Sequence, residues 1–108
     1  MRRRVMTLLL VAGLFSVAAP ASAAVYTDGT CSMSITHTSN QAVAVDLFDT
    51  CYRVQSRITM HVDGSNVTYY GPQATSTSIA NGGAGTYAGS AGRFKTYSSS
   101  SWTGWLAG

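Results

Sequence analysis

A long alternation of apolar and polar residues between Tyr52 and Val62 is the feature that most restricts how this chain can fold. Side chains along an extended strand alternate between its two faces. One face of residues 52–62 carries Tyr52, Val54, Ser56, Ile58, Met60 and Val62, and the other carries Arg53, Gln55, Arg57, Thr59 and His61. This pattern is typical of a half-buried antiparallel strand, with its apolar face toward the core.

The rest of residues 24–108 also favours strands over helices. This region has no Glu and one Lys, and it is rich in Gly, Ser, Thr, Val and Tyr. Period-two patterns over residues 31–38 and 42–47 predict two further strands. Asp63-Gly64-Ser65-Asn66 has the chemistry of a tight hairpin turn, from which residues 67–70 return.

Later strands are less regular in the sequence. Residues 73–80 predict a weaker strand, residues 86–92 are interrupted by glycine, and residues 93–97 alternate again. Short, regularly punctuated strands of this kind predict an all-β fold, a small antiparallel β-sandwich or barrel. The expected core residues are Met33, Ile35, Val43, Val45, Val54, Ile58, Met60 and Val62.

The N-terminus has the three parts of a secretory signal peptide. Three arginines at positions 2–4 precede an apolar run over residues 5–19, and small residues at Ala21 and Ala23 follow. The run of about fifteen residues is shorter than the roughly 20 that cross a bilayer. We expect residues 1–23 to be removed, by cleavage after Ala23 or Ala24, leaving residues 24–108 as a single secreted β domain. The arginines fit both the general and the twin-arginine export routes.

Removal of this segment changes the charge of the protein. Three of the seven basic residues leave with it, and the four that remain are balanced by the four aspartates of the chain. Residues 24–108 are therefore formally neutral. A nucleic-acid-binding protein needs a basic footprint to neutralise phosphates, so we do not expect a nucleic-acid partner. Nor do we expect a stable membrane anchor after cleavage.

The only two cysteines, Cys31 and Cys51, are expected to form a disulfide, because an even cysteine count is typical of exported chains. Closing a loop of about 20 residues stabilises a fold by roughly 3 kcal/mol. Cys51 has the parity of the polar residues Arg53 and Arg57. It therefore lies either beside a β-bulge near residues 50–52 or at a strand end.

No catalytic or metal-binding constellation is evident in the sequence. No serine lies in a Gly-x-Ser-x-Gly elbow, and the aspartates are scattered through turns, where such residues usually bind backbone N–H groups. We expect no cofactor or metal. The leading hypothesis is an exported, non-enzymatic binding or interaction protein. The alternatives are a small secreted hydrolase that uses His37 or His61, and an envelope-active or antimicrobial protein.

Aromatic residues are the remaining signal. Tyrosine and tryptophan supply large rigid contact areas and are enriched in binding hot spots. Tyr69 and Tyr70 are adjacent on a predicted strand and should point to opposite faces. The partner is expected to be an extracellular protein or carbohydrate. The contact candidates are Arg53, Arg57, Tyr69, Tyr70 and Trp102.

The Arg-rich signal, the Ala21-Ser22-Ala23-Ala24 cleavage region and the Ser/Thr/Gly-rich strands resemble those of small exported proteins from high-GC Gram-positive bacteria. Within that group the chain is similar to the microbial proteinaceous α-amylase inhibitors, which are small disulfide-stapled β-sandwiches. The matching features are Cys31 and Cys51, the strand over residues 57–62, and residues 85–94. A second disulfide and the Trp-Arg-Tyr inhibitory motif of that family do not occur here. The resemblance therefore implies the fold rather than the inhibitory activity.

Overall fold

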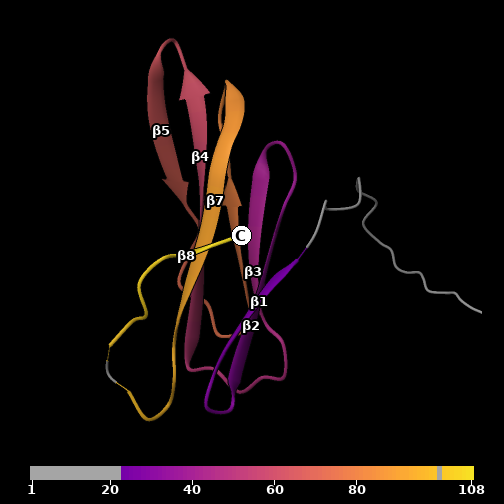
Figure 1. Cartoon of the computed structure of the whole chain (residues 1–108), viewed down its shortest axis with the longest axis vertical. Helices are drawn as coiled ribbons and strands as arrows, with labels where there is room; N and C mark the ends of the chain where they lie inside the picture. The colour runs from indigo at the N-terminus through magenta and orange to yellow at the C-terminus, as the bar shows by residue number, and fades with distance from the viewer. Residues whose placement is uncertain (1–22, 100) are drawn as a thin grey trace, which may run out of the picture.

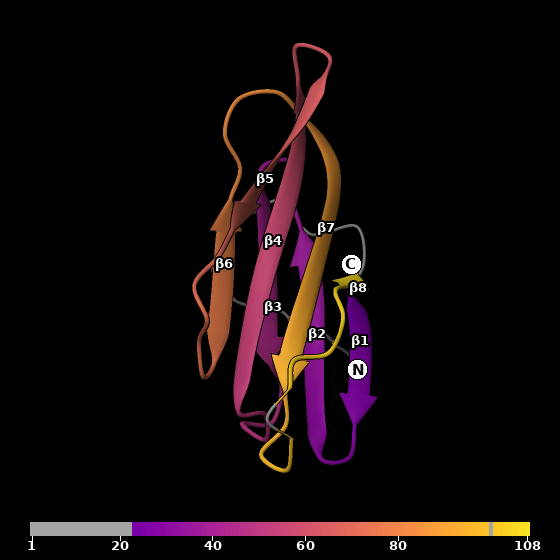
Figure 2. The same cartoon turned by 90° about the vertical axis from the view of Figure 1, so that its left-hand side faces the viewer.

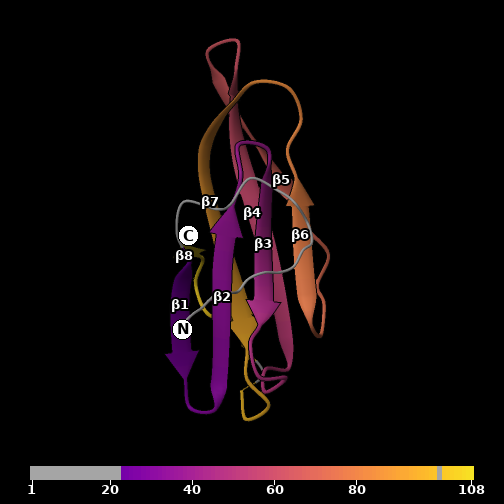
Figure 3. The ribbon, with the colours of Figure 1, turned by 90° about the vertical axis from the view of Figure 1, so that its right-hand side faces the viewer.

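The computed structural model describes residues 23–99 and 101–108, which form two four-stranded antiparallel sheets packed into a sandwich (Figure 1). The predicted all-β fold is confirmed. The first sheet, seen from outside in Figure 3, has the order β1 (Ala24–Asp28), β2 (Cys31–His37), β3 (Gln41–Asp46), β6 (Thr77–Asn81). The second, seen from outside in Figure 2, has the order β5 (Ser65–Tyr70), β4 (Arg53–Val62), β7 (Thr86–Lys95), β8 (Leu106–Ala107).

The predicted signal segment, residues 1–23, lies outside the described residues except for Ala23. The first strand, β1, begins directly after it at Ala24 and pairs with β2. The sequence analysis did not predict β1. Within the described part of the chain, no helix has the length and apolarity needed to span a membrane.

Strand β4 confirms the predicted alternation from Arg53 to Val62. The expectation was wrong for Tyr52, which precedes the strand and is 40% exposed instead of facing the core. Val54, Ser56, Ile58 and Met60 are buried, so the side chains between them point out of the sandwich. The hairpin after β4 turns at Asp63 and Gly64, which have φ values of 49° and 79°. Two consecutive positive φ values are the geometry expected of an Asp-Gly hairpin turn.

Residues 86–95 form the single strand β7, although glycines interrupt the sequence. The pairing of β7 with β4 passes from Thr59–Gly89 to Met60–Tyr87, which leaves Ala88 unpaired in a β-bulge. The bulge changes the parity of the strand, and Tyr87 therefore packs against the core. Glycine suits the inner side of β7, since a Cβ at Gly92 would lie 3.0 Å from the Ile35 side chain.

The predicted core is correct for β2 and most of β4 but wrong for β3. Val43 and Val45 are only half-buried, whereas Ala42, Ala44 and Asp46 face the core. The register explains the reversal, because Ile35 pairs with Ala44 and cross-strand partners share a face. Large side chains from β2, β4 and β7 fill the space between the sheets, so β3 contributes alanines there. Val62 is half-buried against the upper cluster.

A buried serine pair separates the core into two apolar clusters. The lower cluster holds Cys31, Met33, Ile35, Ala44, Cys51, Val54 and Phe94, and the upper holds Ala42, Ile58, Met60 and Ala80. Between them, Ser78 Oγ accepts a hydrogen bond from the Ser56 N–H (3.0 Å) and donates one to Pro72 O (2.6 Å). The polar groups of this pair are thus satisfied across the two sheets. Gly71 lies against both serines, where a Cβ would approach each hydroxyl to 2.6 Å.

The Cys31–Cys51 disulfide joins β2 of the first sheet to the residue pair before β4 of the second. The predicted bond is therefore confirmed, and Cys51 occupies a strand end rather than a bulge. The buried Asp46 carboxylate accepts hydrogen bonds from the Thr50 and Cys51 N–H groups, both at 2.9 Å. This acid performs the turn-capping role expected of the aspartates.

The reversed orientation of β3 generates a stability prediction. Ala44→Leu should lower the free energy of unfolding by about 1–3 kcal/mol, because the buried site has no room for added methylene groups. Val45→Thr should change it by less than about 0.5 kcal/mol, since this side chain lies on the outer face of the sheet. Urea denaturation of the two variants measures both effects. A larger loss for Val45→Thr than for Ala44→Leu would contradict the orientation.

Candidate binding surface

The outer face of the second sheet gathers basic residues from two strands. Arg53 of β4 pairs with Lys95 of β7, and two positions further along Gln55 pairs with Arg93. Arg57 lies two more positions along β4, with Ala91 on one side and Tyr70 of β5 on the other. Because cross-strand partners share a face, the antiparallel pairing places these side chains on one surface of the sheet. The strands of this sheet are seen from outside in Figure 2.

The C-terminal segment crosses this face after leaving β7 and returns to its edge as β8 (Figures 1 and 2). Thr103 N donates to Phe94 O (2.9 Å), and Phe94 N donates to Thr103 Oγ1 (3.1 Å). Further on, Tyr26 of the first sheet donates from its hydroxyl to Ala107 O (2.6 Å). These bonds hold the indole rings of Trp102 and Trp105 over the sheet.

The basic side chains and the indole rings alternate in space. The Arg93 guanidinium carbon lies 4.5 Å from the Trp102 ring centroid and 4.6 Å from that of Trp105. Arg57 lies 4.5 Å from Trp105, and Lys95 Nζ lies 5.3 Å from Trp102. All four distances are within the roughly 6 Å of a cation–π contact. We call Arg57, Trp105, Arg93, Trp102 and Lys95 the cation–aromatic ladder.

Tyrosines continue the surface beyond both ends of the ladder. Tyr70 contacts Trp105 with ring centroids 5.8 Å apart. At the other end, the Tyr52 ring contacts Arg53 at 4.5 Å and Tyr97 at 5.5 Å. Tyr70 is 59% exposed and Tyr97 is 73% exposed. The ladder therefore holds its own rings between cations, while the tyrosines remain open to solvent.

Arg93 is fixed at the centre of the ladder by hydrogen bonds as well as by ring contacts. Its Nε and Nη2 both donate to Gln55 Oε1, at 3.0 and 2.8 Å. The Gln55 amide nitrogen in turn donates to Gly71 O (3.0 Å). Gln55 is buried although it points outward, because the ladder covers it. For Arg57 and Lys95 the structure records no side-chain hydrogen bond to another described residue.

The charges of the described chain are separated in space. Its four cationic side chains, Arg53, Arg57, Arg93 and Lys95, all belong to this surface. Of the acids, Asp46 is buried below the β3–β4 loop, Asp49 lies in that loop, and Asp63 is at the tip of the β4–β5 hairpin. Asp28 alone approaches the surface, where it lines an open hollow of about 180 Å³ together with Phe94, Thr96, Ser99, Ser101, Trp102 and Thr103.

Four of the five contact candidates, Arg53, Arg57, Tyr70 and Trp102, come together on this surface. The fifth, Tyr69, points the other way and packs against the upper core cluster. This is the opposite orientation expected of adjacent tyrosines. The sequence reasoning did not select Tyr52, Arg93, Lys95, Tyr97 or Trp105. The signal that could have found Arg93 and Lys95 is their alternation around Phe94, which is 2% exposed.

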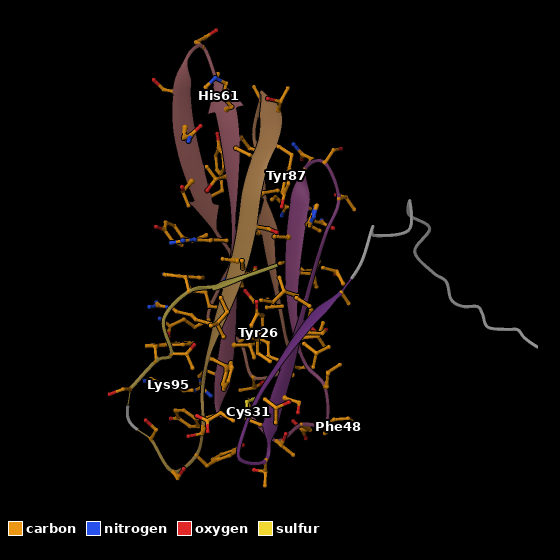
Figure 4. The ribbon with its side chains drawn as sticks, viewed as in Figure 1. Tyr26, Cys31, Phe48, His61, Tyr87 and Lys95 are labelled. Atoms are coloured by element: carbon orange, nitrogen blue, oxygen red, sulfur yellow. A yellow bond between two sulfur atoms is a disulfide. The ribbon has the colours of Figure 1, made fainter. Side chains whose placement is uncertain are left out.

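His61 lies at the opposite end of the sandwich from Lys95, and His37 contacts Tyr87, which is at the same end as His61 (Figure 4). The exposed His61 contacts Asn66 through Nδ1 (2.9 Å). His37 ends β2 and stacks on Tyr87, with ring centroids 4.2 Å apart and planes within 5°. Its Nδ1 lies 3.2 Å from Thr38 O. Among the described residues, neither imidazole hydrogen-bonds to a carboxylate or a hydroxyl group.

No group of three or more His, Cys, Asp or Glu side chains within residues 23–99 and 101–108 is arranged to hold a metal ion. Comparison with known proteins found no match to a family model, a curated protein or a solved structure.

The contacts of the ladder predict that Arg93 contributes more to the free energy of unfolding than Arg53 does. Arg93→Ala should lower the free energy of unfolding by about 2 kcal/mol, because it removes two ring contacts and leaves the buried Gln55 without its partner. Arg53→Ala should cost less than about 0.5 kcal/mol, since Arg53 contacts only Tyr52. Both tryptophans of the chain lie on the ladder, so tryptophan fluorescence during denaturation follows it directly. Equal costs for the two variants would contradict this assignment.

Proposed function

We propose that this chain is an exported, non-enzymatic binding protein, and that it contacts an anionic partner through the outer face of the second sheet. One observation carries the proposal. The four cations of the described chain and the rings of Tyr52, Tyr70, Tyr97, Trp102 and Trp105 share one surface. Clustered charge of one sign steers oppositely charged partners and selects among them.

The rigidity of this surface supports binding as its role. Arg93 is held by Gln55 and by two rings, and the strands beneath it are paired on both sides. A preorganised surface loses little side-chain freedom when a partner binds, which favours affinity. The histidine environments favour binding over the hydrolase alternative, because a general base must reach the proton that it removes. Substrate turnover that is abolished by His37→Ala or His61→Ala would overturn this choice.

Export is supported by the disulfide, which is compatible with an extracellular protein because such bonds persist in oxidising compartments. The position of β1 is consistent with cleavage after Ala23. This cut leaves Ala24, the first residue of the strand, paired with Ile35. Cleavage one residue later removes that pair. Inhibition of amylase is not part of the proposal, since the inhibitory tripeptide is absent from the sequence.

Processing provides the first test. When the full chain is expressed in a secreting bacterial host, the protein in the medium should begin at Ala24 or Val25. N-terminal sequencing of that protein measures the cleavage position. A form that keeps Met1 and occurs only in membranes would contradict export.

The second test concerns the contact surface. The secreted protein is immobilised and used to capture partners from its native medium, beside the variants Tyr97→Ser and Arg53→Gln/Lys95→Gln. Both variants should capture less than about one tenth of the partner, because interface hot spots contribute on the order of 1–2 kcal/mol each. The control is Ser39→Asp/Thr77→Asp, which lowers the net charge equally at exposed positions of the first sheet. Equal capture by all four proteins would refute the proposed surface.

A further inference from the structure

We infer that the partner of this surface is a linear acidic polysaccharide, a polymer whose sugar units carry carboxylate, sulfate or phosphate groups. This inference rests on the proposed function and specifies the chemical class of the partner. Three features of the surface support it: the spacing of the cations, the contacts of each indole ring with two cations, and the exposed tyrosines at both ends.

The cations form a track rather than a pocket. Arg53 and Lys95 pair across the strands at one level, Arg93 lies opposite Gln55 at the next, and Arg57 lies two residues beyond. Two residues of strand span roughly 6–7 Å, so the track extends for about 13 Å along β4. An open row of charges fits a polymer that bears repeated anions, whereas a small anion would need an enclosed site with convergent donors.

The donors of the track are available. Arg57 and Lys95 are half-buried, and the structure records no hydrogen bond from the side chain of either to another described residue. Their ring contacts fix their positions and leave N–H groups to donate. A guanidinium binds a carboxylate or a sulfate through two parallel hydrogen bonds. Asp28 is the one acid near the track, and it lies beside Trp102 at the lower end.

The ring contacts of the indoles disfavour nucleic acid. Single strands are bound by stacking bases on open aromatic faces, but each indole is half-buried and already contacts two cations. Trp105 contacts Arg57 and Arg93, and Trp102 contacts Arg93 and Lys95. The exposed rings are instead tyrosines at the two ends, Tyr70 and Tyr97. A tyrosine offers an apolar ring to the C–H groups of a sugar and a hydroxyl to its oxygens.

A lipid surface is disfavoured by the distribution of apolar side chains. Interfacial binding combines basic residues with an apolar face that enters the bilayer. The exposed rings that share the face of the cations, Tyr70 and Tyr97, carry hydroxyl groups. The exposed ring of Phe48, which carries no polar group, lies on the other side of the sandwich from Lys95 (Figure 4). The exposed rings beside the cations are therefore not the wholly apolar side chains that enter a bilayer.

The test measures binding of the secreted protein to polygalacturonate, a linear polymer with one carboxylate on each sugar. The comparison ligand is its methyl ester, which has the same backbone without the charge. We expect binding to polygalacturonate, at least about ten-fold weaker binding to the ester, and a further loss as salt rises from about 0.05 to about 0.5 M. Equal binding to the two polymers would overturn the inference.

Two variants locate the interaction on the track. Arg53→Gln/Lys95→Gln should weaken polygalacturonate binding by roughly ten-fold, and Arg57→Gln by a few-fold. A single cooperative unfolding transition that begins above the assay temperature is the check that each variant is folded. The control Ser39→Asp/Thr77→Asp, which has the same net charge as the first variant, should bind within about two-fold of the wild type. If the control loses as much affinity as Arg53→Gln/Lys95→Gln, net charge explains the binding and the inference is wrong.

Three further ligands separate this inference from the proposed function. Poly-glutamate, single-stranded DNA and vesicles of phosphatidylglycerol with phosphatidylcholine should each bind more weakly than polygalacturonate. Tighter binding of any of them would overturn the polysaccharide as partner. If such binding still depends on Arg53 and Lys95, the proposed contact surface is supported and only the ligand class is refuted. If the binding does not depend on these residues, the contact surface and the ligand class are both refuted.

Discussion

Two bonds at the start of β4 determine the geometry on which the rest of the structure depends. The disulfide holds Cys51 against the buried face of β2, and the Asp46 carboxylate binds the N–H of the same residue. The chain thus enters the second sheet at a fixed point, and a shift of one residue in β4 would exchange its two faces. With this register, Val54 faces the core and Arg53 faces solvent. The same register of β4 therefore determines which side chains form the core and which form the candidate binding surface.

Local sequence patterns correctly predicted the elements whose structure depends mainly on neighbouring residues. The alternation over residues 53–62 and the Asp63-Gly64 turn need no distant partner, and both are correct. The predicted orientation of β3 was wrong. Valine is more apolar than alanine, but side chains from three other strands determine how much volume is left for β3 in the core. Strand β7 was predicted only in part, since Gly92 reflects close contact with Ile35 of the opposite sheet rather than a turn. Tertiary packing overrode propensity in both places.

The sequence predicted individual residues of the candidate surface, but it did not predict that they come together. Arg53 and Arg57 were visible because they share the polar face of one strand, and Trp102 because of its chemistry. The alternation around Phe94 indicates only that Arg93 and Lys95 share a polar face. They reach the same surface as Arg53 and Arg57 through the pairing of β4 with β7, which joins segments about 30–40 residues apart and cannot be read from either segment alone. Trp105 reaches it because the chain turns back after Trp102 to pair as β8. The ladder is thus a property of topology and not of any motif.

Formal neutrality is a poor guide to how this molecule meets a partner. Cations about 7 Å apart near a protein surface repel one another by roughly 1–2 kcal/mol, and the acids that balance them in the total lie mainly elsewhere. The indole rings offset part of that repulsion, at about 0.5–2 kcal/mol for each contact. A carboxylate in the same place would cancel the charge, whereas the neutral rings leave the side chains positive. The ladder therefore keeps the cations close together and still positive. An anion placed along the track would relieve the repulsion that remains, so the contacts that stabilise the fold also favour the anionic ligand that we propose.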